Sequence, residues 1–292
     1  PVTGLIIALI LALAAPSLAF SALLLLQSDN VNQRTMTARA MQGVDGIADT
    51  LDRELRGMLT NLALLASSGW IESEEYDRLH ARATEALKGT DMYLIALDSQ
   101  NQQILNTRVP WGTPLGATSD PKPVEEAIAN SQPVVSDLFF GSVARREVFN
   151  VVMPIISGDP RVKALMLTRD ADKLGSIFQE RLPPPGWTYA ILDRTGKKVT
   201  GNAPAGGAEA LSQLCAGEGS GLDAFKVDGA SLIAANEKLE PWGWRACVWT
   251  SSNQTDASIS QRWRNFTIIT LAIVGITMLA GGALGQMLAG AI

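Results

Sequence analysis

Two long apolar segments without a charged side chain limit what this chain can fold into. Residues 1–26 and 266–292 contain no lysine, arginine, aspartate or glutamate, and all 24 basic and 29 acidic residues lie between them. At a rise of about 1.5 Å per residue, either segment is long enough as a helix to cross about 30 Å of hydrocarbon. The sequence therefore predicts two transmembrane helices with a water-exposed domain between them, and it excludes a freely soluble enzyme.

The first apolar segment has two interpretations. Ser17-Leu18-Ala19 resembles a signal-peptide cleavage site, but the apolar run continues through 20–26 and no basic residues precede it, which favours an uncleaved anchor. The second segment runs to Ile292 without a basic cluster, so we expect a fragment whose output domain would follow. We expect the central segment to lie outside the cytoplasm, since an N-terminal anchor followed by a translocated domain is the commoner arrangement.

Charge and motif content exclude several functions. The net charge is −5 with no basic block, which argues against nucleic-acid binding. The sequence holds one histidine, His80, and contains no Gly-x-Ser-x-Gly elbow, HExxH helix or P-loop. We therefore expect no catalytic residues, no metal and no cofactor in this chain.

Residues 28–68 read as one long helix. Its apolar residues alternate at spacings of four and three, which is a heptad seam: Val44, Ala48, Leu51, Leu55, Met58, Leu62 and Leu65. The seam either pairs with a second copy of the chain or is covered by the chain's own domain.

Beyond residue 88 the apolar period changes from helical to strand-like, and the pattern occurs twice. Strands at 92–98 and 103–107, a helix at 123–130 and strands at 133–139, 147–155 and 161–168 are followed by a helix at 170–181 with Asp170 as its N-cap. After Pro183-Pro184-Pro185-Gly186, strands at 187–193 and 198–200, a helix at 208–216 and strands at 224–227, 231–236 and 244–250 follow the same order. Both halves place an aspartate, Asp98 or Asp193, between an apolar strand and a polar turn, which indicates an internal duplication.

The chain resembles the double Cache sensor family, and most closely the extracytoplasmic sensors of bacterial histidine kinases. The resemblance rests on short runs: Arg53-Glu-Leu-Arg56, Leu105-Asn-Thr-Arg108, Pro110-Trp-Gly-Thr-Pro-Leu115, Val135-Ser-Asp-Leu138, Val152-Met-Pro154 and Leu182-Pro-Pro-Pro-Gly-Trp187. It implies an α+β fold of two PAS-like modules in tandem on a long N-terminal helix. The expected parts are a transmembrane helix (1–27), a stalk helix (28–70), a membrane-distal module (71–182), a membrane-proximal module (183–262) and a second transmembrane helix (263–292).

The resemblance also implies a function. The expected protein is a homodimeric two-component sensor of the bacterial inner membrane that binds a small molecule on the periplasmic side. One alternative is an ectodomain that only dimerises or binds a protein. Another is the sensor of a cyclic-di-GMP enzyme or of a chemotaxis receptor, since sensors of this type precede several kinds of output domain.

The implied ligand pocket lies in the distal module. An arginine fork beside an aromatic wall suits a small carboxylate ligand. Alternatively, Arg108 and Asp137 could pair with each other. The family's amino-acid-binding pattern calls for more tyrosines than the three in this sequence, which argues against an amino-acid ligand. The candidate residues are Tyr93, Asn106, Arg108, Trp111, Ser136, Asp137, Phe139, Arg145, Arg146 and Asn150.

Both cysteines of the chain, Cys215 and Cys247, fall in the second module. An oxidising compartment would favour a disulfide between them. The alternative is two buried, unpaired thiols, and the sequence does not fix their distance.

Overall fold

The computed structural model of the chain describes residues 2–156, 161–178, 183, 186–204, 206–217, 222–227, 229–251, 263–276, 279 and 282–283, without the side chains of 2–19 and 21–33. The chain divides into two compact units. One comprises Ala40–Asp228 and Ile233–Thr250, and it holds the first sheet and most of the second. The other comprises Pro1–Arg39, Gly229–Leu232 and Ser251–Ile292.

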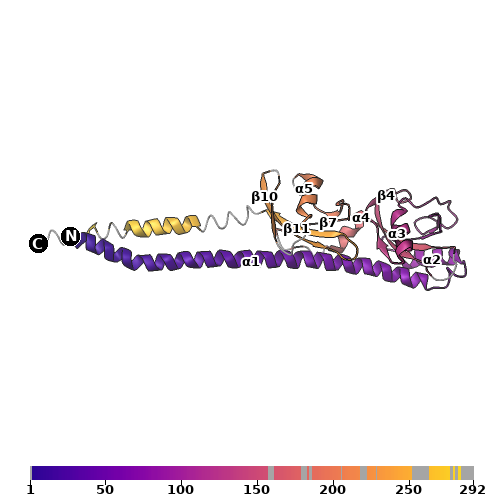
Figure 1. Cartoon of the computed structure of the whole chain (residues 1–292), viewed down its shortest axis with the longest axis horizontal. Coiled ribbons are helices and arrows are strands. Elements are labelled where there is room, and N and C mark those ends of the chain that lie inside the picture. The colour runs from indigo at the N-terminus through magenta and orange to yellow at the C-terminus, as the bar shows by residue number, and fades with distance from the viewer. Residues whose placement is uncertain are drawn as a thin grey trace. The chain divides into compact units, whose positions relative to one another are not determined.

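The first helix, α1, extends over Val2–Ala66. From Ala40 onward its apolar seam is buried against the chain's own sheets: Val44, Leu51, Leu55 and Leu62 are fully buried. Of the two interpretations of the heptad seam, coverage by the chain's own domain therefore holds over residues 44–62. Figure 1 shows this part of α1 running along the sheets.

Within the described residues, no helix is long and apolar enough to cross a membrane. The C-terminal helical stretch is described over 263–276, and parts of the expected second span, including 284–292, lie outside the described residues. The two spans stay a prediction.

The first sheet is antiparallel and follows α2 (Tyr76–Ala86). Its strand order is β2-β1-β6-β5-β3, and β4 pairs with β5 beside β3. The bounds of its elements are β1 Met92–Leu97, β2 Gln103–Asn106, α3 Lys122–Asn130, β3 Val134–Val135, β4 Phe139–Gly141, β5 Arg146–Pro154 and β6 Ala164–Asp170. These strands lie close to the predicted ones.

The second sheet has the order β8-β7-β11-β10-β9. Between the sheets the chain forms α4 (Ala171–Leu174) and a short 3-10 helix, η1 (Gly175–Phe178). The elements of the second half are β7 Thr188–Leu192, β8 Lys198–Gly201, α5 Gly207–Leu214, β9 Asp223–Val227, β10 Ala230–Lys238 and β11 Arg245–Ser251.

The two sheets share a turn of the same geometry after their first strands. Oδ1 of Asp98 accepts backbone N–H groups of Gln100 (2.8 Å) and Gln102 (2.9 Å). Oδ1 of Asp193 likewise accepts those of Thr195 and Lys197, both at 2.9 Å. The same offsets and the same strand order support the interpretation of an internal duplication.

Alternation along the strands of the first sheet creates two different faces. Leu94, Phe149, Val151, Leu165 and Leu167 pack in the main core with the seam of α1. The opposite face packs against α3 over part of its area, where Val124 and Ala127 meet Val152 and Met166. The remainder of that second face is polar and carries the candidate site.

Two predicted elements were wrong in extent. The strand expected at 133–139 is split into β3 and β4, because Ser136–Leu138 turn toward the second sheet and bond there. The helix expected at 170–181 is described as α4 and η1, ending at Phe178, and residues 179–182 lie outside the described residues. Asp170 forms no side-chain cap on α4, and its carboxylate instead binds two arginines.

One turn of α1 binds the second half of the chain through Asp52. Its carboxylate accepts hydrogen bonds from Nε1 of Trp242 (2.8 Å) and Nε of Arg56 (2.6 Å). Burial alone raises the pKa of Asp52, but the hydrogen bonds from Arg56 and Trp242 and the charge of Arg56 outweigh it and hold the pKa below 3.8. The stabilisation of the fold by the ionised Asp52 is therefore present above about pH 3.8, and it is lost as the pH falls through the lowered pKa of Asp52 in the folded state.

We expect Asp52→Asn to lower the free energy of unfolding by about 1 kcal/mol at pH 7, the usual net value of such hydrogen bonds. The difference from the parent chain should shrink as the pH falls through the lowered folded pKa of Asp52, because the parent carboxyl then becomes protonated. Urea denaturation at pH 7 and at a series of lower pH values measures it, with the exposed Asp49→Asn as the control. An equal loss at every pH would contradict this explanation.

Candidate functional site

A cavity lies over the polar part of the first sheet's second face. It is lined by β1, β2, β4, β5 and β6, by Thr118 and Ser119, and by the loop 142–144. Its volume, measured as the space open to the centre of a water molecule, is about 30 Å³. That volume holds one or two water molecules, so a larger ligand requires the loops to move apart.

Two arginines and one carboxylate form a charged wall, of which Arg108 alone lines the cavity. Asp170 is buried, and it accepts Nη2 of Arg108 on Oδ1 (2.5 Å) and Nη1 of Arg146 on Oδ2 (3.2 Å). The guanidinium of Arg108 lies over the ring of Tyr93, at 3.7 Å from its centroid, which is a cation–π contact. Arg108 is mostly buried, whereas half of the Arg146 side chain is exposed.

The floor of the cavity is a hydrogen-bonded polar network. Thr168 donates from Oγ1 to Oδ1 of Asn150 (2.7 Å), and the backbone N–H of Asn150 donates to Oγ of Ser136 (2.8 Å). On β2, Nδ2 of Asn106 donates to Gln103 (2.8 Å), and its Oδ1 accepts the backbone N–H of Arg108 (3.0 Å). These bonds fix the floor side chains in place without a ligand.

The structure brings together seven of the ten candidate residues. The residues that line the cavity are Asn106, Arg108, Phe139 and Asn150. The residues that contact this lining or the charged wall are Tyr93, Ser136 and Arg146. The structure places Trp111, Asp137 and Arg145 elsewhere.

Asp137 faces the second sheet and does not pair with Arg108. Its Oδ1 accepts the backbone N–H (3.0 Å) and Nε (3.1 Å) of Arg194, while Oδ2 of Asp193 accepts the backbone N–H of Leu138 (3.0 Å). Burial lowers the pKa of Arg194, but the hydrogen bond and charge of Asp137 and the charge of Glu126 raise it above its ordinary value. This reciprocal pairing ties the segment after β3 to the turn of the second sheet.

Trp111 and Arg145 lie outside the cavity for separate reasons. Trp111 is half exposed and contacts the ring of His80, with centroids 5.7 Å apart. His80 is not fully solvated, since its Nε2 lies 2.9 Å from the carbonyl oxygen of Val109. Arg145 is exposed in the β4–β5 loop, at a positive φ of 55°.

Among the residues of the site that sequence reasoning missed are Asp170 of the charged wall and Thr168 of the cavity floor. Asp170 fitted a helix N-cap, because a short polar residue before a helical pattern is the usual signal. The period-two alternation of Met166, Thr168 and Asp170 along β6 is the signal that places them on one face.

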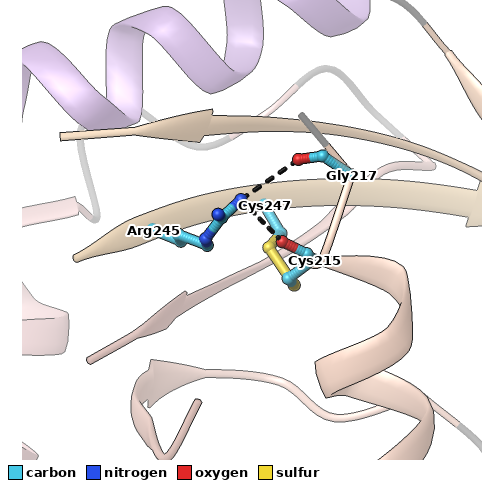
Figure 2. Close-up of a disulfide and its surroundings, with 4 residues drawn as sticks. All are labelled: Cys215, Gly217, Arg245 and Cys247. Carbon is cyan, nitrogen blue, oxygen red and sulfur yellow. Dashed lines mark hydrogen bonds between the residues drawn. A yellow bond between two sulfur atoms is a disulfide. The ribbon is translucent and has the colours of Figure 1, made fainter. Parts of the chain in front are cut away.

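The corresponding face of the second sheet is built differently. If Asp98 and Asp193 are equivalent, the strand registers make Thr188 the counterpart of Tyr93 and Trp249 the counterpart of Thr168. A disulfide joins Cys215, at the end of α5, to Cys247 on β11, and both are buried. Arg245 donates from Nη1 to the carbonyl oxygens of Cys215 (3.3 Å) and Gly217 (3.1 Å), as Figure 2 shows.

Three larger hollows, of about 220 to 240 Å³, occur elsewhere on the domain. In the first, Arg194 is already paired with two carboxylates. In the second, beside Trp111, His80 is held by the Val109 carbonyl. In the third, Arg245 bonds backbone carbonyls. Among the described residues, no group of histidine, cysteine and acidic side chains could hold a metal ion.

No protein-family model matches the sequence, and no curated protein matches it. Solved structures do share its fold. The ligand-binding domain of Mlp24 with asparagine is 12% identical, with a TM-score of 0.59, over 81% of this chain and 99% of that one. The ligand-binding domain of the amino-acid chemoreceptor PctB of Pseudomonas aeruginosa PAO1, in complex with L-Arg, is 14% identical, with a TM-score of 0.56, over 75% of this chain and 89% of that one.

A third solved structure is the extracellular domain of rpHK1S-Z16, described as a histidine kinase. It is 13% identical, with a TM-score of 0.55, over 79% of this chain and 97% of that one. At these identities the likeness concerns the fold. The chain therefore shares the fold of these three ligand-binding and extracellular domains.

Proposed function

We propose that this chain is the small-ligand sensor region of a bacterial membrane receptor, and that the ligand binds in the cavity of the first sheet. The observation that carries the proposal is the charged wall, which reaches that cavity through Arg108. Asp170 links Arg108 to Arg146, which is half exposed and bonds only Asp170. Such convergence of polar groups over an apolar cavity is typical of ligand sites.

The contrast between the sheets supports the choice of site. On the second sheet, a disulfide, Trp249 and an arginine bonded to backbone carbonyls occupy the face that corresponds to the cavity. The larger hollows offer volume, but their charged groups are already paired. Two arginines on one buried carboxylate, rather than volume, distinguish the first sheet.

Membrane attachment and the output are further parts of the proposal. The uncharged segments 1–26 and 266–292 would anchor the domain, and the disulfide favours an oxidising, extracytoplasmic location. We propose a two-component histidine kinase, active as a homodimer, as the parent protein. One similar structure is described as a histidine kinase, while another is described as the ligand-binding domain of an amino-acid chemoreceptor.

A specific observation favours a second candidate function, an ectodomain that dimerises or binds a protein without a small ligand. The cavity of about 30 Å³ is too small for an organic ligand in this conformation. The two candidates differ in whether the cavity opens, and a binding measurement separates them.

Calorimetric titration of the detergent-solubilised chain against a panel of L-amino acids and small carboxylates tests the proposal. We expect at least one compound to bind, and we expect Arg108→Ala to weaken it at least tenfold, because a charge-assisted bond contributes about 1.5–3 kcal/mol. Arg53→Ala, at an exposed position of α1, is the matched control and should leave affinity unchanged. Absence of any binding compound would favour the second candidate.

A further inference from the structure

The hollow beside Trp111 is much roomier than the cavity of the first sheet. Its volume is about 220 Å³, against about 30 Å³ for that cavity measured in the same way. A cavity of about 150 Å³ with apolar walls is enough to bind benzene. The hollow therefore has room for an aromatic ring in the conformation that the structure shows. The apolar part of its lining is Ile104, Leu105, Val109, Pro110, Trp111 and Leu115.

Two aromatic rings lie together in this lining. The ring of Trp111, in the loop after β2, meets the ring of His80, on α2, with centroids 5.7 Å apart and planes inclined by 56°. Half of the Trp111 side chain is exposed, so a ligand that covers it removes apolar surface from water. Aromatic rings that pack offset or edge to face gain further energy beyond the area they bury. These rings therefore favour an aromatic ligand over a saturated one of the same size.

Hydrogen bonds hold the loop of Trp111 in place. Nε2 of His80 lies 2.9 Å from the carbonyl oxygen of Val109, and it carries the hydrogen because a carbonyl oxygen only accepts. The carbonyl oxygen of Pro110 accepts the backbone N–H (3.2 Å) and Oγ1 (2.7 Å) of Thr113. Nδ1 of His80 and Nε1 of Trp111 form no hydrogen bond with a described residue, so a ligand hydroxyl can bond either one. A ligand thus meets an ordered wall, which lowers the entropic cost of binding.

The lining carries no formal charge apart from what His80 gains on protonation. None of the described side chains that line the hollow is aspartate, glutamate, lysine or arginine. Arg108 precedes the loop, but it lines the cavity of the first sheet and bonds Asp170. The polar side chains of Asn106 and Thr113 are bonded within the protein. A charged ligand would lose water here without meeting an opposite charge, which is costly.

We propose that this hollow is a second small-molecule site, and that it binds an uncharged aromatic compound the size of a phenol against Trp111. Among the lining residues that the structure describes, the hollow and the cavity of the first sheet share Asn106 alone. The inference goes beyond the proposed function and does not depend on it. No covalent step is involved.

Four probes test the class of ligand: phenol, cyclohexanol, benzoate and benzylammonium. They are titrated by ligand-observed NMR against the detergent-solubilised full chain at pH 8, with detergent alone as the blank. Phenol should bind most tightly, and cyclohexanol about fivefold more weakly because it lacks the aromatic ring. Benzoate and benzylammonium should bind the hollow at least about tenfold more weakly than phenol. Binding of either charged probe that persists in the Trp111→Ala variant belongs to another site and is subtracted.

Three variants test the place of binding. Trp111→Ala should weaken phenol at least about fivefold, because it removes the exposed ring of the wall. Phe140→Ala removes another exposed aromatic ring, outside the hollow, and should leave phenol affinity unchanged. Arg108→Ala, which the proposed function expects to weaken ligands of the first-sheet cavity, should also leave phenol affinity unchanged.

The outcomes separate this inference from the proposed function. Phenol binding that is lost in Arg108→Ala and kept in Trp111→Ala would place phenol in the first-sheet cavity and overturn the second site. Equal losses in the Trp111 and Phe140 variants, or no binding beyond the detergent blank, would overturn it as well. Cyclohexanol or a charged probe that binds the hollow as tightly as phenol would overturn the class of ligand. In each of these cases the sensor function still stands or falls on the panel of amino acids and carboxylates.

Discussion

Replacing Cys215 and Cys247 together with alanine should lower the free energy of unfolding by about 3 to 4 kcal/mol. The bond spans a sequence separation of 32 residues, and closing a loop of this length in the unfolded chain accounts for a loss of about that size. The disulfide also holds the end of α5 on β11, where Arg245 bonds the carbonyl groups of Cys215 and Gly217. The loss should therefore be accompanied by weaker protection of α5 amides.

Urea denaturation followed by tryptophan fluorescence measures this effect. Addition of dithiothreitol should lower the unfolding midpoint of the parent chain but leave the double alanine variant unchanged. Both sulfurs are buried, so reduction of the native protein should be slow compared with reduction during unfolding. A loss below about 1 kcal/mol in the double variant would contradict a stabilising role for the bond.

Phe149→Ala should be the most destabilising single substitution in the first sheet, at about 3 to 5 kcal/mol. Phe149 is fully buried and contacts Trp244, the residue before β11 of the second sheet, edge to face, with ring centroids 5.1 Å apart. Nε1 of Trp244 in turn donates to the carbonyl oxygen of Ser136 (3.2 Å). Loss of the Phe149 ring would leave a cavity where the two sheets meet, directly behind the strand that carries Asn150.

Phe140→Ala is the matched control, because Phe140 lies on the neighbouring strand β4 with 61% of its surface exposed. The free energy of unfolding of the Phe140→Ala variant should stay within about 0.5 kcal/mol of the parent value. Thermal and urea denaturation of both variants provide the comparison. Similar losses in the two would show that the contact between the sheets carries little of the stability.

The regular elements could be predicted from sequence because their signals are local. Strand alternation and the aspartate turns at Asp98 and Asp193 place the sheets, and the heptad seam places α1. The break between β3 and β4 could not be predicted in this way. It depends on bonds from Ser136, Asp137 and Leu138 to residues more than 50 positions away, which no local pattern reveals.

The candidate site was predictable in part, because the resemblance to the sensor family implies a pocket in the first half of the chain. Arg108 and Asn150 were among the candidates implied in this way, and each follows or lies on a predicted strand. Asp170 was not, because the same residue type fits a helix N-cap and only the tertiary structure shows which partner it takes. An aromatic wall beside an arginine was expected from among the candidates, and the ring stacked against Arg108 is that of Tyr93, from the opposite strand of the hairpin.

The most direct test of a ligand site on the first sheet is amide hydrogen exchange of the chain with and without the tightest-binding compound of the panel. Binding should slow exchange in the loop that includes Ser119, in the β4–β5 hairpin at 139–150 and around Thr168, while the strands bordering Arg245 exchange as before. Protection confined to the second sheet around Cys215 and Arg245, or to the loop of Trp111, would contradict the assignment.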